Sequence, residues 1–198
     1  MVKDQEVLFI DGPWLKVSKN GEPGWIHGDY VTEVSPILVA DTGLPTFVVG
    51  QPNPTNGANT LKVREIIKDI FGLGKSGDCL NCTEYATYRI KTKLGIDISW
   101  PVTSGRNGGR WGVIFQTAEL YNVLAEPKTN CAMCFTSGIS NDPKINEIGH
   151  VAFVEEVLSD GSIKISEANW PHNGIYNERV IPKEKWQNQY KAQFVDFV

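Results

Sequence analysis

The order of two sequence patterns restricts the fold of this chain more than any other feature. Apolar residues first recur at helical spacing, as in TLKVREIIKDIFGLG (60–74), where glycines end the pattern, and in WGVIFQTAELYNVL (111–124). After residue 130 the pattern changes to short β-rich runs, namely NCAMCF, GHVAFVEEV and IKISEANW. Helices followed by a run of strands predict an α+β domain.

The segment NCTEYATYRIKTKLG carries the start and stop signals of a helix. Asn81 suits the N-cap, Glu84 stands three residues later as in a capping box, and Gly95 suits the position after the last turn. Two lysines fall in the last turn, where positive charge is favourable. We therefore predict a helix whose first residue is Cys82.

The last two strand-like runs predict a β-hairpin that turns at Asp160-Gly161. The alternation of side chains places His150, Glu167 and Asn169 on one face of the sheet. With a two-residue turn, however, Glu167 pairs with Val154 and not with His150. A bulge, a longer loop or strong twist is required to bring the carboxylate to the imidazole.

Composition excludes several classes of partner. With 41% apolar residues among 198, the chain can bury a core, and its net charge of -4 gives no basic surface for a nucleic acid. No apolar run is long enough to span a bilayer. The first residues, MVKDQEVLFIDGPW, do not resemble a signal peptide, which leaves a cytosolic protein, another export route or a missing start.

Two segments precede the α+β domain, which we place at residues 62–198. Residues 1–36 are rich in Trp and Gly, and WLKVSKNGEPGWIHG predicts a strand, a turn at Asn20-Gly21 and a second strand. Residues 37–61 contain three prolines and several turn residues, so they form either a linker or an ordered arm.

A cysteine at the start of a helix is well placed to act as a nucleophile. Unpaired N–H groups and the positive end of the helix dipole favour the thiolate of Cys82, which is the attacking species. Such a nucleophile needs a base, and the chain has three histidines. His27 belongs to the N-terminal segment and His172 follows a proline in a predicted loop, whereas His150 opens a strand that gives it rigid support.

Three stretches resemble motifs of the cysteine- and histidine-dependent amidohydrolase/peptidase (CHAP) family. NCTEYATYR is similar to the nucleophile motif, GHVAFVEEV to the His strand and ISEANW to the Glu-x-Asn strand, in the order that the family has. The resemblance covers roughly residues 62–198. It implies a papain-like fold, with N-terminal helices packed on an antiparallel sheet, and cleavage of amide bonds in peptidoglycan.

The same resemblance implies a role for each motif residue. Cys82 would be the nucleophile, His150 the base and Glu167 the group that orients the imidazole. Asn169 would be an auxiliary polar residue. The backbone N–H of Cys82 would contribute to an oxyanion hole, and Asn81 would assist there if its side chain does not cap the helix.

Further expectations concern the cleft and the N-terminal segment. Trp170 is the candidate cleft aromatic, and His172 is a loop residue that could line the same cleft. Residues 1–36 resemble the C-terminal part of a bacterial Src-homology-3-like domain, on WLKV and NGEPGWIHGDYV, which implies a partial β-barrel. Such modules typically bind cell-wall peptide. Some CHAP members bind calcium through an Asp-rich loop, but GLGKSGDC offers only Asp78, so we expect no calcium and no cofactor.

The four cysteines also allow a zinc site. Cys79-x-x-Cys82 and Cys131-x-x-Cys134 form a four-thiolate pattern, but the gap between the pairs exceeds the ~15–20 residues of common zinc ribbons. In a strand, Cys131 and Cys134 would point to opposite faces. We therefore expect no metal, and either strand packing for these two cysteines or one disulfide to Cys79.

Together these patterns predict a monomeric peptidoglycan amidohydrolase or endopeptidase that acts through a Cys-His-Glu site and an acyl-enzyme. We expect it to work outside the cell or in the cell wall. Two alternatives remain: a non-catalytic peptidoglycan-binding protein and a zinc-stabilised interaction module. The sequence leaves open which amide or peptide bond is cut, and whether the chain is a bacterial autolysin or a phage lysin.

Overall fold

The computed structural model describes residues 6–11, 14–19, 22–27, 43–74, 77–171 and 173–198. The chain divides into two compact units, Met1–Gly43 and Leu44–Val198, and each is described by itself. Among the described residues, no helix is both long and apolar enough to cross a membrane.

The N-terminal unit contains an antiparallel sheet of three strands, β1 (Glu6–Asp11), β2 (Trp14–Lys19) and β3 (Glu22–His27). Lys19 pairs with Glu22, so the predicted pairing of the strands that flank Asn20-Gly21 is confirmed. That turn itself and residues 28–36 lie outside the described residues. Three strands do not identify a Src-homology-3-like barrel, which stays a prediction.

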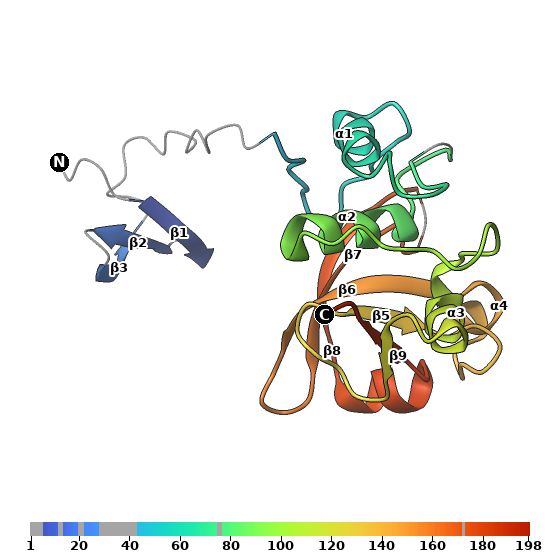
Figure 1. Cartoon of the computed structure of the whole chain (residues 1–198). Coiled ribbons are helices and arrows are strands. Elements are labelled where there is room, and N and C mark those ends of the chain that lie inside the picture. The colour runs from blue at the N-terminus through green and yellow to red at the C-terminus, as the bar shows by residue number, and fades with distance from the viewer. Residues whose placement is uncertain (1–5, 12–13, 20–21, 28–42, 75–76, 172) are drawn as a thin grey trace. The chain divides into compact units, whose positions relative to one another are not determined.

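The second unit is built on a six-stranded sheet in which every neighbouring pair is antiparallel (Figure 1). This confirms the predicted α+β class. The strands follow the spatial order β4 (Asn122–Leu124), β9 (Gln193–Asp196), β5 (Ala132–Phe135), β6 (His150–Val157), β7 (Ile163–Ala168) and β8 (Tyr176–Ile181).

The helices agree only in part with the sequence pattern. Their bounds are α1 (Ala58–Ile66), α2 (Cys82–Leu94), α3 (Trp111–Ala118), α4 (Pro143–Ile148), the 3-10 turn η2 (Gly108–Arg110) and the π-helical turn η3 (Lys185–Gln189). Helix α2 begins and ends as predicted, and Gly95 has the expected left-handed conformation with φ 72°.

Two predicted helices are shorter in the structure. Helix α1 ends at Ile66, and the apolar residues Ile67, Ile70 and Leu73 that continue its pattern are buried from turns instead. The predicted helix 111–124 ends at Ala118, because Glu119 adopts a left-handed φ of 52° and the following residues pair with β9 as strand β4. Periodicity therefore located the buried residues but not the helix ends.

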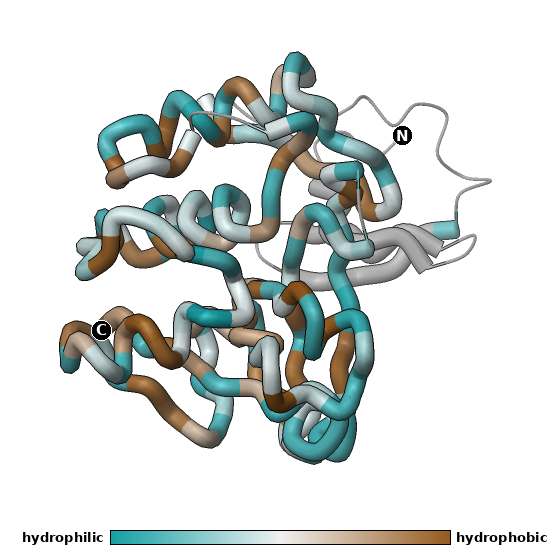
Figure 2. Tube along the Cα trace, turned by 90° about the vertical axis from the view of Figure 1, so that its right-hand side faces the viewer, coloured by the Kyte–Doolittle hydropathy of each residue, from teal (hydrophilic) through white to brown (hydrophobic). Residues whose placement is uncertain are grey.

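Two apolar clusters fill the two faces of the sheet. One lies between the sheet and helices α1 to α3 and includes Tyr85, Trp111 and Phe153. The other includes Met133 and Trp186 and is covered by α4 and η3. Hydrophobic and hydrophilic stretches alternate along the trace in Figure 2, as expected of elements with one buried face.

Residues 44–57 open the second unit and pack against the rest of it before α1 begins. The ring of Phe47 stacks on Tyr176 at a centroid distance of 5.0 Å and meets Tyr85 edge-on at 5.3 Å. Farther along, the carbonyl oxygen of Asn53 accepts a hydrogen bond of 2.9 Å from the N–H of Leu80, two residues before α2. The segment therefore fixes the chain that leads into Cys82.

Candidate active site

Cys82 is the first residue of α2, and its position is fixed by a buried ion pair. The carboxylate of Glu84 accepts a hydrogen bond of 3.0 Å from the backbone N–H of Asn81, the N-cap residue. Arg64 of α1 donates from Nε to the same carboxylate at 2.8 Å. Because Glu84 is only 3% exposed, this pair ties α1 to the start of α2. The predicted capping residues are thus both in place.

His150 and Glu167 lie in direct contact, which a simple hairpin would not allow. Their connection is one residue longer than a two-residue turn, since Leu158 pairs with Ser162. The ladder also shifts between Val154 and Glu156. Beyond this bulge Phe153 pairs with Ser166. In the same register Glu167 lies opposite Ala152, so it is the diagonal neighbour of His150 on the same face. The Nε2–H of His150 then donates to Oε2 of Glu167 at 2.9 Å.

The bulged residue is itself anchored from two sides. Arg89 of α2 donates to the Glu155 carboxylate from Nη2 at 2.7 Å and from Nε at 3.0 Å. Ser166 of β7 donates from its hydroxyl at 2.6 Å. These bonds hold the bulge and therefore the register on which the His150–Glu167 contact depends.

The pKa values of Cys82 and His150 are shifted by the interaction between the two side chains. Burial alone would raise the pKa of the Cys82 thiol, but the charge of His150 and a hydrogen bond to it outweigh burial, so the pKa is lowered. Burial would likewise lower the pKa of His150, but Cys82 and Glu167 raise it to about 9. Because Nε2 binds Glu167, Nδ1 is the nitrogen left for Cys82. Both shifts favour transfer of the thiol proton to the imidazole, which gives a thiolate–imidazolium pair.

Glu167 also binds a residue that the sequence analysis missed. Arg179 of β8 donates from Nε to Oε1 at 2.6 Å and from Nη2 to Oε2 at 3.1 Å. Burial would raise the pKa of the Glu167 carboxyl, but His150 and Arg179 together lower it. Recognising YNERVI as a third strand of the meander would have placed Arg179 on the face that carries Glu167.

Asn169 contacts the chain before the nucleophile. Its Nδ2 donates to Oδ1 of Asn81 at 3.1 Å, and its Oδ1 accepts from Sγ of Cys79 at 3.3 Å and from the N–H of Gly174 at 2.9 Å. These bonds join the loop after β7 to the segment that enters α2. They occupy the side-chain oxygen of Asn81, the residue for which an oxyanion role is implied.

An aromatic ring lies beside the imidazole. Trp170 is partly buried, and its ring centroid is 5.1 Å from that of His150. The ammonium of Lys144 lies 5.0 Å from the centroid of the same indole. Trp170 is thus next to His150, but its role as a cleft aromatic stays a prediction, and His172 lies outside the described residues.

A pair of glycines gives His150 its place, and this signal was also missed. A Cβ on Gly108 would come within 2.7 Å of the Val151 nitrogen. A Cβ on Gly109 would come within 2.5 Å of the Gly149 Cα and 2.8 Å of the Phe135 carbonyl oxygen. Only residues without a side chain allow η2 to lie this close to the start of β6.

The other three cysteines have different environments. All four are free, and Cys131 and Cys134 are fully buried in the clusters on opposite faces of the sheet, as predicted. This placement does not fit a single site shared by four thiolates. Burial raises the pKa of Cys131 to about 12 and also raises that of Cys134, and burial with Asp78 raises that of Cys79. Only Cys82 has a lowered thiol pKa.

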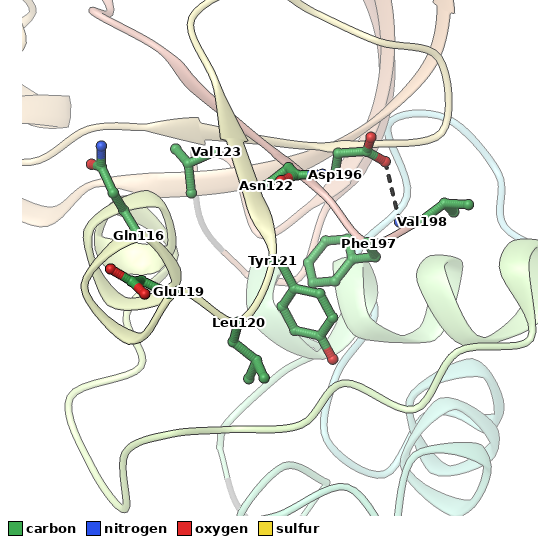
Figure 3. A pocket seen from close by; sticks show the side chains of 9 residues that line it. All are labelled: Gln116, Glu119, Leu120, Tyr121, Asn122, Val123, Asp196, Phe197 and Val198. Atoms are coloured by element: carbon green, nitrogen blue, oxygen red, sulfur yellow. Dashed lines mark hydrogen bonds between the residues drawn. The ribbon is translucent and has the colours of Figure 1, made fainter.

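Two surface cavities lie away from these groups. The larger, about 520 Å³, is shown in Figure 3, where the Asp196 carboxylate accepts from the backbone N–H of Val198 at 3.2 Å. It is lined by Gln116, Glu119, Leu120, Tyr121, Asn122, Val123, Asp196, Phe197 and Val198. The smaller, about 330 Å³, lies beside Tyr88 of α2. Neither is lined by the Cys82–His150 pair. Among the described residues, no three His, Cys, Asp or Glu side chains are grouped to hold a metal ion.

Comparison with known proteins finds a family model that matches this region. Residues 74–169 match the CHAP domain family. A 100-residue stretch is 39% identical to an N-acetylmuramoyl-L-alanine amidase domain-containing protein of Staphylococcus aureus, covering 50% of this chain and 15% of that protein. Staphylococcal secretory antigen SsaA of Staphylococcus epidermidis is 26% identical over 163 residues, covering 80% of this chain and 50% of that protein.

Solved structures are also similar over part of the chain. The crystal structure of an N-acetylmuramoyl-L-alanine amidase from Staphylococcus aureus aligns with a TM-score of 0.47 at 34% identity, covering 58% of this chain and 29% of that one. The chain therefore spans between 15% and 50% of the length of these relatives.

Proposed function

We propose that this chain, whose residues 74–169 form a CHAP domain, is a cysteine amidohydrolase that cleaves an amide bond of peptidoglycan. One observation carries the proposal. The buried His150 is held by Glu167 at 2.9 Å, and its interaction with Cys82 lowers the pKa of that thiol. A nucleophile, a base and a group that orients the base are the parts that acyl transfer through a thiol requires.

The reaction begins with the thiolate–imidazolium pair. The sulfur of Cys82 attacks the carbonyl carbon of the amide, and the backbone N–H of Cys82 at the helix start stabilises the oxyanion. His150 gives its Nδ1 proton to the leaving amine, the C–N bond breaks, and a thioester remains on Cys82. Water, deprotonated by His150, attacks the thioester, and the carboxylic acid leaves as the thiolate re-forms.

Glu167 and Asn169 have supporting roles in this scheme. Glu167 fixes the imidazole through Nε2 and stabilises its positive charge, as the acidic member of a catalytic triad does. Asn169 holds the loop after β7 against the residues that precede Cys82, so it sets the approach of the two halves of the site. Trp170 supplies an apolar wall next to His150.

The scissile bond and the place of action are proposed by analogy with relatives. One relative is named an N-acetylmuramoyl-L-alanine amidase domain-containing protein and another a secretory antigen. By analogy we propose the amide between muramic acid and L-alanine as the scissile bond, and action outside the cell or in the cell wall. A monomer suffices, because Cys82, His150 and Glu167 all come from one chain.

Digestion of purified peptidoglycan tests the proposal. The wild-type chain is expected to release amino groups with time, and mass spectrometry of the fragments identifies the bond. His150→Ala is expected to be inactive. Glu167→Gln, which keeps the shape but removes the charge, is expected to be impaired less, because it orients the base without reacting. A folded wild-type chain that binds peptidoglycan but releases no amino group would instead support a non-catalytic binding protein.

A further inference from the structure

The buried carboxylate of Glu167 faces two cations from neighbouring strands. His150 lies on β6, and Arg179 lies on β8 on the opposite side of β7. Both oxygens of Glu167 accept a bond from Arg179, and Oε2 also accepts the bond from His150. The guanidinium thus completes the set of hydrogen bonds on a carboxylate that has no exposed surface.

A carboxylate in this place needs such a partner. Burial of an unpaired charge is strongly unfavourable, and a buried carboxyl responds by taking up a proton. A protonated Glu167 would no longer stabilise a positive charge on His150. A guanidinium stays charged at all accessible pH values and presents two parallel donors, so it meets both requirements.

We propose that Arg179 is a positioning residue of the proposed hydrolase, which keeps Glu167 ionised and oriented so that His150 and Cys82 remain an ion pair. Arg179 does not touch the reacting atoms. It acts through Glu167 and then through His150. The expected effect on catalysis rests on the proposed function. The ionisation of Cys82, however, can be measured without any substrate.

The surroundings of Arg179 fit this role. Its guanidinium lies 5.9 Å from the ring centroid of Phe135, which in turn is 5.1 Å from the His150 ring. Its side chain is 30% exposed, so one edge reaches solvent while the donors to Glu167 point inward. Tyr190, which follows η3, packs on the same Phe135 ring at a centroid distance of 5.0 Å.

These groups define what a pH measurement would report. The titratable or charged groups in contact with Glu167 are His150 and Arg179, and Cys82 is reached through His150. Without Arg179, Glu167 takes up a proton more readily, the imidazolium loses its partner, and thiolate formation at Cys82 moves to higher pH. A role limited to joining β7 and β8 would lower stability but would leave this midpoint unchanged.

The test compares Arg179→Gln and Arg179→Lys with the wild-type chain. The rate of Cys82 alkylation by iodoacetamide is measured against pH, with the modified residue identified by mass spectrometry and folding checked by circular dichroism. In Arg179→Gln the alkylation midpoint is expected to rise by about one pH unit, the lower end of the shift that an adjacent opposite charge produces. At any pH well below the midpoint, Arg179→Gln is then expected to be alkylated about tenfold more slowly than the wild-type chain.

Arg179→Lys keeps the charge but not the paired donors, so a smaller upward shift is expected together with reduced turnover. The control is Lys128→Gln, which removes another cation paired with a largely buried carboxylate, that of Asp196 on β9, at 2.7 Å. It is expected to leave the midpoint at the wild-type value.

Distinct outcomes separate the two claims. The inference alone is overturned if the wild-type chain turns over substrate and Arg179→Gln has the wild-type alkylation profile. If Arg179→Gln does not fold, a wild-type profile in Arg179→Lys has the same meaning. An equal shift in Lys128→Gln would also overturn it. A wild-type chain without turnover and without a reactive Cys82 would instead refute the proposed function.

Discussion

Replacement of Gly109 by alanine should damage the proposed site without touching any reacting group. The added Cβ would lie 2.5 Å from the Cα of Gly149 and 2.8 Å from the carbonyl oxygen of Phe135. The nearer contact is about 0.9 Å short of the 3.4 Å at which ordinary contact begins. Both neighbours are backbone atoms, so no side-chain rotation relieves the overlap. The start of β6 has to move, and His150 is the residue that follows Gly149.

The size of the effect follows from that displacement. Overpacking of this kind costs about 1–3 kcal/mol of stability. A misplacement of about 1 Å at a catalytic site lowers the rate by up to about 100-fold. We therefore expect Gly109→Ala to fold with reduced stability, measured by urea unfolding, and to lose far more kcat/KM in peptidoglycan hydrolysis than the stability loss explains at room temperature.

The matched control lies in the same turn. Asn107 is exposed and makes no side-chain cap bond to η2, so Asn107→Ala is expected to keep wild-type stability and activity. If Gly109→Ala retains the wild-type kcat/KM and unfolding midpoint, the close approach of η2 to β6 does not position His150, and the reasoning is wrong.

Three other predictions follow from the site. Turnover is expected to have a bell-shaped pH profile, which rises as Cys82 ionises below the ordinary thiol pKa and falls as His150 loses its proton near pH 9; a profile that still rises above pH 9 would contradict it. Glu84→Gln leaves the largely buried Arg64 without its counter-charge and should lower the free energy of unfolding by about 3 kcal/mol, as urea titration would show. Cys79→Ser should retain most activity in the same digestion assay, because a hydroxyl can replace the thiol as donor.

The sequence was most informative where one residue type has one local role. Asn81, Glu84 and Gly95 predicted both ends of α2, because caps act within a few residues of the helix end. The same local signals placed Cys82 at the first position of the helix. Apolar spacing predicted the buried residues of α1 but not its end, since buried turns use the same apolar residues as a helix.

Contacts between distant residues were predicted less well. The facing of His150 and Glu167 followed from alternation, and the need for an irregularity in the hairpin was foreseen, but its place was not. The bulge depends on Glu155, whose carboxylate binds Arg89 from another element. Arg179 was missed for the same reason, because its role arises only when β8 pairs with β7.

The Gly108-Gly109 pair shows a third limit. In the sequence, RNGGRW reads as a loop, because glycine is common in turns. Its function as a close contact with β6 depends on the packing of two segments forty residues apart, which no local pattern encodes.

Mass spectrometry of the acid-quenched chain during peptidoglycan digestion tests the central claim most directly. The acyl-enzyme predicts a covalent adduct with the mass of the acyl fragment, mapped by fragmentation to Cys82 and not to Cys79, and no adduct or turnover in a folded Cys82→Ala variant. Turnover that continues in Cys82→Ala, or an adduct carried by Cys79, would contradict the account.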